Sequence, residues 1–459
     1  MAQRISSKSS GPGNIAKVFV KSNDGGKTFD IAEKGSPIRF TYYESILQDV
    51  IHATITYVDT GNSVDNQTVV EGLPITGSES VDLVFEDVSK QQIKVTLLVN
   101  KVTKVMEDAG KTMVTLEMNS KELFDNDKIR INTRLDGKIS EHVNKILKKD
   151  QNYIATTKEA DVEDTQNEYN KICNNKKPFY MINWFCTQSA PQGKLGKSAG
   201  FMFWETSEKF HFKSIDKLFA QSPKKSIIFT DTPDSGGSNI PPGYDVKALD
   251  FNVDNRNNIQ DKLEQGAYST RLITFNPFNC YYKVTYQNAG NTQGGRSTET
   301  NEGNLDMAGK NLPKLNPNIK KATTKEGQED FSRTTFKYLD VGSLPQGKGD
   351  GDEGQEQIEK SEEEVAKPGE VLNQAIMRMN QMNNMLVSIT IPGDFSLHAG
   401  DAVKVDAPQL SSGKSKQAQT EVNKQEGGLY IIRDICHYMT PRETYTKINV
   451  VRDSVGRKV

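Results

Sequence analysis

Cysteine is scarce in this chain of 459 residues, which contains four: Cys173, Cys186, Cys280 and Cys436. No two of them are separated by only two residues and none has a neighbouring cluster of ligand residues, so neither a zinc motif nor a disulfide framework is indicated. Isolated thiols are typical of a reducing compartment. We therefore expect free and mostly buried cysteines.

Long apolar runs are also missing. Hydrophobic residues make up 35% of the chain, its mean hydropathy is -0.64, and no run approaches the length of a membrane span. The first ten residues have no apolar core of the kind found in a secretory signal. We expect a protein made and kept, at least at first, in a cytoplasm, with much surface or partner contact. Charge gives no bias toward nucleic acid or membrane, because 58 basic residues face 60 acidic ones.

The common catalytic motifs are absent: the phosphate-binding loop, the zinc-protease His-Glu-x-x-His and the hydrolase Gly-x-Ser-x-Gly. The five histidines are His52, His142, His211, His398 and His437. His398 and His437 could form a metal or acid–base pair if their strands meet. We favour ordinary hydrogen-bonded strand histidines, because no acid or cysteine completes a usual ligand set. The sequence thus predicts no catalytic, cofactor-binding or metal-binding residues.

Five aspartates could be combined into a carboxylate pair for glycoside hydrolysis. They are Asp216, Asp231, Asp234, Asp250 and Asp254. Their spacing does not distinguish them from solvated or helix-capping acids in a chain that is 26% charged. We therefore predict that the protein is not an enzyme.

Two apolar segments in the middle and late parts of the chain have structural and functional interpretations. An aromatic hairpin at 200–213 could stack on sugars or bases, but core packing is favoured because it is the densest apolar spot nearby. Methionines recur at 377, 379, 382 and 385 on a predicted helix that begins at Val371. They indicate an adaptable contact surface or plain core packing about equally.

The clearest pattern in the sequence is the last stretch, from Leu386 to Asp453. Four runs in it are rich in β-branched and aromatic residues and are bounded by Gly, Pro or Asp, which is typical of strands. Short breaks between runs of period two predict an antiparallel meander or small barrel.

A similar pattern occurs near the start of the chain. The nine residues Leu73–Val81 match the nine residues Phe395–Val403, and the strand-like runs that follow also correspond. We interpret this as a duplicated β domain, with Gly77 equivalent to Gly400 and Val81 equivalent to Val403.

Taken in order, the chain divides into four parts. Strand patterns fill 1–120 and predict a first β-barrel domain; 121–287 mixes helices and strands and predicts an α+β domain; and 371–459 predicts a second β-barrel domain. The predicted fold is mainly β, with two tandem antiparallel β-barrels flanking an α+β insert.

Residues 288–370 form the fourth part, a polar and acidic linker or assembly arm. They are poor in aliphatic residues, and the run from Asp350 to Glu364 is strongly acidic. Such a composition cannot offset an ordering cost of about 1 to 2 kcal/mol per residue, so we expect mobility in the free protein. Phe331, Phe336, Tyr338 and Leu339 offer a local anchor, as one strand added to a barrel edge.

These motifs resemble the baseplate hub subunit of contractile-tailed bacteriophages and the related type VI secretion spike proteins. The resemblance rests on Leu386–Asp394, on Leu-x-x-Gly-Asp-x-Val from Leu397 to Val403, on Gly428–Tyr438 and on Arg452-Asp453-Ser454. The hairpin near 200–218 and the segment Gly72–Val81 are also similar, whereas 288–370 has no counterpart.

The resemblance implies a trimeric structural hub located in the tail baseplate of the virion and assembled in the host cytoplasm. In that family three copies place six similar barrels around a channel, which matches a six-fold tail tube to a three-fold central spike. Tube or tube-initiator proteins, the spike and wedge proteins are then the partners, while DNA and the tape-measure protein pass through without sequence-specific binding. The second barrel of the family can be discontinuous, so the 200–213 hairpin could belong to it. A tail-associated cell-wall hydrolase and the hub of a non-viral contractile injection system are the alternatives.

Overall fold

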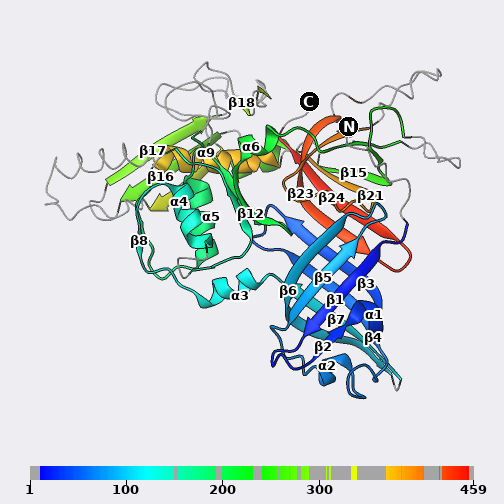
Figure 1. Ribbon diagram of the computed structural model, residues 1–459. Coiled ribbons are helices and arrows are strands. Elements are labelled where there is room, and N and C mark those ends of the chain that lie inside the picture. The colour runs from blue at the N-terminus through cyan, green and yellow to red at the C-terminus, as the bar shows by residue number, and fades with distance from the viewer. Residues whose placement is uncertain are drawn as a thin grey trace, which may run out of the picture.

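The computed structural model describes most of the chain, and structural statements below concern only that part. It describes residues 11–108, 110–148, 153–166, 168–192, 199–230, 240–255, 258–267, 269–276, 281–288, 306–307, 310–311, 332–338, 368–383, 385–407, 423 and 426–453. Most of the described elements are strands, and the largest sheet contains 14 of them (Figure 1). The predicted mainly β class is confirmed.

The first β module is built from the N-terminal part of the chain. It consists of β1 (Asn14–Lys21), β2 (Thr28–Asp30), β3 (Ser36–Ser45), β4 (His52–Asp59), β5 (Ser80–Glu86), β6 (Gln92–Asp108) and β7 (Lys111–Asn119), with the short helices α1 (Ile31–Lys34) and α2 (Val69–Gly72). Buried side chains alternate along β5 and β7, because successive strand residues point to opposite faces. The inward residues, among them Val81, Phe85 and Leu116, form one apolar core.

The second β module is assembled from two separated parts of the chain. It consists of β13 (Lys225–Ile228), β14 (Val246–Lys247), β15 (Asp250–Asn255), β21 (Met385–Pro392), β22 (Ala402–Asp406), β23 (Gly428–Met439) and β24 (Thr444–Arg452). β13 pairs in parallel with β22, and β15 pairs antiparallel with β21. The strands at 225–255, which we assigned from the sequence to the α+β insert, thus pair with the C-terminal strands. The second module is therefore not confined to 371–459.

The two modules have the same strand order. It is β2-β1-β5-β6-β7-β4-β3 in the first and β14-β13-β22-β23-β24-β21-β15 in the second. The register repeats as well, since Val81 lies opposite Leu97 and Val403 lies opposite Tyr430. Two pairings differ in direction: β1 is antiparallel to both β2 and β5, whereas β13 is parallel to both β14 and β22. The repeated order agrees with the duplication that the sequence predicts.

The register corrects one predicted equivalence. Ser78 and Gly400 both have positive φ angles, of 71° and 89°. The Ser78 amide donates to the carbonyl of Val99 at 2.7 Å, and the Gly400 amide donates to that of Ile432 at 2.8 Å. A β-bulge follows directly after Val99 and after Ile432. Ser78 is thus the equivalent of Gly400, and Gly77, which we predicted for this position, lies one residue too early.

The modules join through β3 and β23 into one continuous sheet. Phe40–Ser45 pairs antiparallel with Asp434–Met439, and Tyr42 lies opposite His437. Among the described strands the sheet ends at β14 and β2, with β24, β21 and β15 branching from β23, and no pairing closes a barrel. The sequence predicts two closed tandem barrels, but the described strands form one open sheet that the two modules share.

An α+β part packs beside the sheet (Figure 1). It contains α3 (Lys121–Lys128), α4 (Ile139–Leu147), α5 (Pro178–Gln188), β8 (Arg134–Leu135), β9 (Glu159–Val162), β10 (Lys171–Ile172), β11 (Phe201–Glu205), β12 (Lys209–Ser214) and α6 (Ile215–Phe219). The predicted hairpin is present as β11 and β12, but it pairs with β9 rather than with the large sheet. Phe201 and Phe203 pack in the α+β core, whereas Met202 and Trp204 pack in the core of the second β module. The hairpin therefore ties two cores together.

A smaller sheet lies against helix α9 (Pro368–Met382). This sheet has the order β17-β16-β20, and the remaining short elements lie close to it in the chain. The strands of this sheet are β16 (Ser269–Asn276), β17 (Tyr281–Asn288) and β20 (Arg333–Tyr338). The other short elements are α7 (Ile259–Gln265), β18 (Asp306–Met307) and β19 (Lys310–Asn311). The anchor strand predicted around Phe336 is β20, which joins β16 and not the large sheet. The acidic run 350–364, Phe331 and Leu339 lie outside the described residues.

A membrane-spanning helix would need to be longer and more apolar than any helix in the described part of the chain.

Candidate functional site

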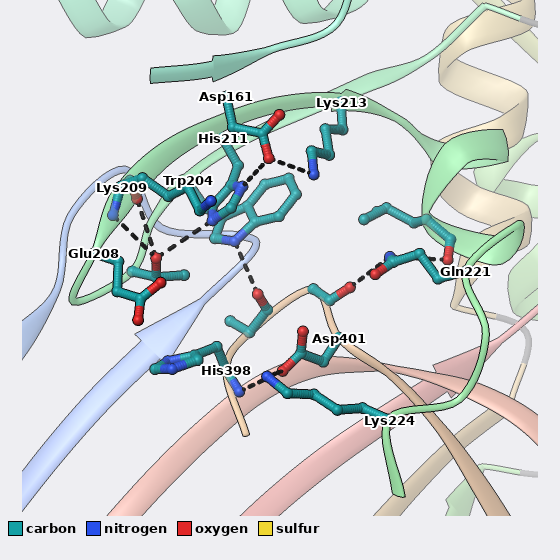
Figure 2. A pocket seen from close by; sticks show the side chains of 14 residues that line it. Asp161, Trp204, Glu208, Lys209, His211, Lys213, Gln221, Lys224, His398 and Asp401 are labelled. Carbon is teal, nitrogen blue, oxygen red and sulfur yellow. Dashed lines mark hydrogen bonds and ion pairs between the residues drawn. The ribbon is translucent and has the colours of Figure 1, made fainter. Parts of the chain in front are cut away.

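A pocket of about 280 Å³ opens where the α+β part meets the second β module. One wall is the β11–β12 hairpin, the second is the end of α6 with the segment after it, from Leu218 to Lys224, and the third is the turn His398–Asp401 before β22. Figure 2 shows the side chains of these three elements converging around the indole of Trp204. Segments nearly two hundred residues apart in the chain thus form one polar cavity.

Trp204 is the centre of this pocket. Its indole N–H donates to the carbonyl of Ala399 at 3.0 Å, and its ring stacks on the imidazole of His211 with centroids 4.8 Å apart. A Cβ placed on Gly400 would lie 2.5 Å from Cζ2 of Trp204. Glycine at this position therefore permits both the positive φ and the close approach of the indole.

The cations of the pocket are balanced by acids. Lys213 forms an ion pair with Asp161 at 2.6 Å, and Lys224 forms one with Asp401 at 2.9 Å. Burial, with some help from Lys213, lowers the pKa of His211 to about 4, so its ring is neutral near pH 7. The cavity can offer hydrogen bonds to a polar group, while its lysines and acids largely cancel in charge.

A buried carboxylate behind the pocket links both β modules to the hairpin. Glu44 of β3 accepts hydrogen bonds from the Tyr42 hydroxyl at 2.8 Å, the Ser207 amide at 3.0 Å, the Ala399 amide at 3.1 Å and His398 Nδ1 at 3.1 Å. Burial alone would raise the pKa of Glu44, but the charge of His398 and these hydrogen bonds lower it to about 2. The pKa of His398 is raised, because Glu44 outweighs the effect of burial. Glu44 is therefore charged near neutral pH, and His398 keeps its proton to a higher pH than an ordinary histidine does.

A second buried carboxylate, Glu205, connects the hairpin to the first β module. It accepts from the Ile51 amide at 2.9 Å and from the Ser120 hydroxyl, and it pairs with Lys158. Burial raises its pKa to about 6 despite the nearby lysine. Glu44 and Glu205 thus anchor a three-way junction between the hairpin and the two β modules, which is a structural role.

The histidines considered from the sequence lie in separate environments. His52 bonds to Asn119, and the buried His142 bonds to the carbonyl of Tyr169. His437 is fully buried, bonds to Thr446 and stacks on Tyr42, which also bonds Glu44. His398 and His437 thus both lie near β3, but each has its own partner. Among the described residues no group of three His, Cys, Asp or Glu side chains could hold a metal ion.

The aspartates considered for hydrolysis do not form a described pair. Asp216 is buried and forms an ion pair with Arg378 of α9, and Asp250 begins β15. Asp231 and Asp234 lie outside the described residues, and the side chain of Asp254 is not described. The role that remains for Asp216 is to join α6 to α9.

The apolar candidates pack internally. The rings of Phe203 and Phe210 stack with centroids 5.7 Å apart, and the other hairpin phenylalanines are buried with them. Met377 and Met382 of the predicted methionine helix are buried, while Met379 is partly buried against two cores. Core packing is therefore the observed role of both segments. Cys173 and Cys186 are free and buried, and Cys436 is free and half-buried.

The junction carboxylates were not predicted. Glu44 stands in Tyr-Tyr-Glu-Ser, a strand run in which a glutamate is normally exposed. The sequence around Glu44 does not indicate its pairing with His398, which lies 354 residues away in the chain. Only the presence of an acid within a strand run of aromatic and β-branched residues could have suggested it.

Comparison with known proteins gives a likeness of fold. No family model and no curated protein sequence matches the chain. The 43 kDa tail protein of prophage MuSo2 from Shewanella oneidensis is similar over 95% of this chain and 98% of its own, with 9% identity and a TM-score of 0.49. A tail protein from Neisseria meningitidis MC58 is similar over 96% and 97%, with 9% identity and a TM-score of 0.49.

A third solved structure comes from a secretion system. The E. coli protein c3393, a component of the type VI secretion system, is similar over 93% of this chain and 76% of its own, with 8% identity and a TM-score of 0.41. The solved structures named here are thus two tail proteins and a component of a type VI secretion system.

Proposed function

We propose that this chain is a structural hub protein of a contractile-tail baseplate, three copies of which form a ring between a six-fold tail tube and a three-fold central spike. The ring would line the channel through which DNA and the tape-measure protein pass. The hub is a scaffold in this proposal and catalyses no reaction.

The repeat of strand order and register within one chain is the observation that carries this proposal. Two equivalent modules per chain let three chains present six equivalent surfaces, and the same three chains keep a three-fold axis. The remaining parts, such as α4 and α5, occur once per chain and would follow the three-fold symmetry only. A duplicated module thus suits an adaptor between six-fold and three-fold partners.

The junction between the modules supports a ring that does not bend freely. β3 and β23 pair over six residues, and Glu44 and Glu205 fix the hairpin against both modules through bonds to buried main-chain amides. Backbone ladders and buried charge-assisted bonds hold orientation well, because breaking them exposes unpaired polar groups. A rigid angle between modules is required if copies are to close a ring.

The charge of the chain agrees with a channel that DNA passes without being retained. DNA affinity depends largely on basic residues that displace counterions from phosphates. With 58 basic and 60 acidic residues the chain has no net attraction of this kind. Spike, tube or tube-initiator, and wedge proteins are the proposed partners, and 288–370 is proposed as an arm that reaches one of them.

A wall hydrolase, the alternative, would need a carboxylic acid that gives up a proton near neutral pH. One acid of the pocket, Asp161, has its pKa lowered: burial would raise it, but Lys213 outweighs that effect. The pocket therefore favours the structural function.

The test is the mass of the assembly. Light scattering on the purified chain, alone and co-purified with its spike protein, should give three copies of this chain in the complex. A complex that contains one or two copies contradicts the proposal. Clearing of a cell-wall suspension by the purified chain would instead favour the hydrolase.

A further inference from the structure

The junction inside the chain predicts how one copy contacts the next. Within the chain, β3 of the first module pairs with β23 of the second. The shared strand order makes β15 the equivalent of β3, and it makes β6 the equivalent of β23. If the second module of one copy contacts the first module of the next copy in the same way, β15 of one copy pairs with β6 of the other. In a single chain these two strands belong to different modules and do not pair with each other.

Both strands have room for this partner along one edge. Beyond Leu98, where its pairing with β5 ends, β6 pairs only with β7 among the described strands. β15 pairs only with β21 in the same described set. The extension of β6 past β5 carries Val105, whose side chain is 58% exposed. A long edge strand with an exposed valine is a ready template for another strand, and soluble proteins normally cover such edges.

The register of the contact follows from the repeat. His437 lies opposite Thr446 in β24, and the equivalent position in the first module is Lys104, which lies opposite Val114 in β7. Both Val114 and Thr446 lie four residues before the residue that faces the start of the bulge. Lys104 thus takes the place of His437.

The partner of Lys104 is found in the same way. Tyr42 lies opposite Ala53 in β4, and Val253 lies opposite Val387 in β21. Ala53 and Val387 in turn face equivalent residues of β7 and β24. Val253 therefore takes the place of Tyr42, and the observed pair of Tyr42 with His437 translates into Val253 with Lys104.

We propose that β15 of one copy pairs antiparallel with the exposed edge of β6 of a second copy, with Val253 opposite Lys104. This inference rests on the proposed ring and names the surfaces that close it. The two edges differ, so the contact is head-to-tail, and a head-to-tail contact generates a ring when its rotation closes. A two-fold contact, which would join two β6 edges or two β15 edges, is excluded by the proposal.

Cysteine cross-linking of separately purified variants tests the contact. Opposed residues of an antiparallel pair have Cα atoms roughly 4.5 to 5.5 Å apart, within the about 4.4 to 6.8 Å that a disulfide spans. Lys104→Cys and Val253→Cys chains, mixed and oxidised, alone and with the spike protein, should give a covalent dimer that neither variant forms by itself. The double variant should give covalent trimers as well.

The matched control is Lys94→Cys mixed with Val253→Cys. Lys94 lies on the same strand, but its stretch of β6 is already paired with β5. This mixture should give no more cross-linked product than the parent chain with its four native cysteines. Melting temperatures of the single variants close to that of the parent show that they are folded.

Each outcome decides a separate point. Three copies by light scattering without the specific cross-link overturn this contact but leave the proposed hub standing. Monomers in every preparation overturn both. Cross-linking of Lys104→Cys with itself, or of the control as strongly as the test pair, overturns the head-to-tail register.

Discussion

His398 Nδ1 lies 3.1 Å from Oε1 of Glu44, although 354 residues separate them in the chain. The pair connects the turn before β22 to β3, and thereby the second β module to the first. Its acid is fully buried, while the histidine side chain is 18% exposed. Removing one partner of a buried ion pair leaves an uncompensated charge, so this contact governs how firmly the modules hold together.

We predict that Glu44→Gln lowers the free energy of unfolding by about 2 to 3 kcal/mol. This loss is smaller than the one expected when a fully buried ion pair is broken, because His398 can release its proton. Glu117→Gln is the control, since its ion pair with Lys101 is exposed and should be worth below about 1 kcal/mol. Urea denaturation of both variants at pH 7 measures the difference. Equal losses at the two positions would contradict the role assigned to Glu44.

The pH dependence of this pair has a defined sign. The folded pKa of Glu44 is about 2, below its ordinary value of 4.5, so its stabilising contribution is complete above pH 4.5 and is lost as the pH falls toward 2. The folded pKa of His398 is raised above 6.5, so its contribution is complete below 6.5 and is lost as the pH rises through the folded value. Between pH 4.5 and 6.5 the pair contributes most.

His437 changes stability with pH in the direction opposite to His398. Burial lowers its pKa to about 4 from 6.5, so the unfolded chain binds a proton that the folded chain excludes, and stability falls as the pH drops from 6.5 toward 4. We predict that His437→Asn, which keeps a polar partner for Thr446, loses less stability than the parent between pH 7 and 5. At about 1.4 kcal/mol per pKa unit the difference is about 2 kcal/mol. Urea midpoints at the two pH values measure it, and parallel loss in both proteins would refute the assignment.

A third prediction concerns Gly400, where a Cβ would both occupy a positive φ and meet the indole of Trp204. Gly400→Ala should cost about 2 to 4 kcal/mol, from overpacking added to the backbone term. Gly61→Ala is the control, because Gly61 also has a positive φ, of 78°, but has open space around it, and it should cost about 1 kcal/mol. Thermal denaturation measures both. The serine at the equivalent position 78 indicates that the backbone alone tolerates a side chain.

The local elements of this fold could be predicted from the sequence because each has its own period or cap. The run at 112–118 is β7, the hairpin at 200–213 is β11 and β12, and the helix 259–265 ends at Gly266 with a φ of 77°. Ser214, a residue type that favours helix N-caps, caps α6 by accepting a hydrogen bond from the amide of Lys217. The apolar segment at 180–185 forms α5, whose buried face shows no strand alternation.

The long-range pairing could not be predicted in the same way. β13 and β22 pair in parallel although their paired residues are 178 positions apart in the chain, and nothing in Lys-Ser-Ile-Ile identifies its partner. The strand β2 ends at Asp30, because the Asp30 side chain accepts a hydrogen bond from the amide of Ala32 and starts α1. The junction carboxylates depend on chain segments that meet only in the folded state. Periodicity reports burial, whereas the identity of a buried neighbour is set by topology.

The last prediction concerns the ion pair between Arg378 of α9 and Asp216 of α6, in which neither side chain is more than 1% exposed. The cost of removing both charges from water is large, so the pair itself adds little compared with two apolar side chains of similar volume. Arg378→Met should therefore lower the free energy of unfolding by about 3 to 5 kcal/mol, because it leaves the Asp216 carboxylate buried without its cation.

Combining Arg378→Met with Asp216→Leu should recover most of that loss, since the double variant buries no uncompensated charge. A double-mutant cycle measured by urea denaturation gives the coupling, and the exposed pair of Lys177 with Asp127 is the control cycle, with a coupling below about 1 kcal/mol. If the double variant is as unstable as the sum of the single ones, Arg378 and Asp216 act independently. In that case α9 is held in place by its other buried contacts, such as the hydrogen bond from Gln381 to the carbonyl of Ala267, and not by this pair.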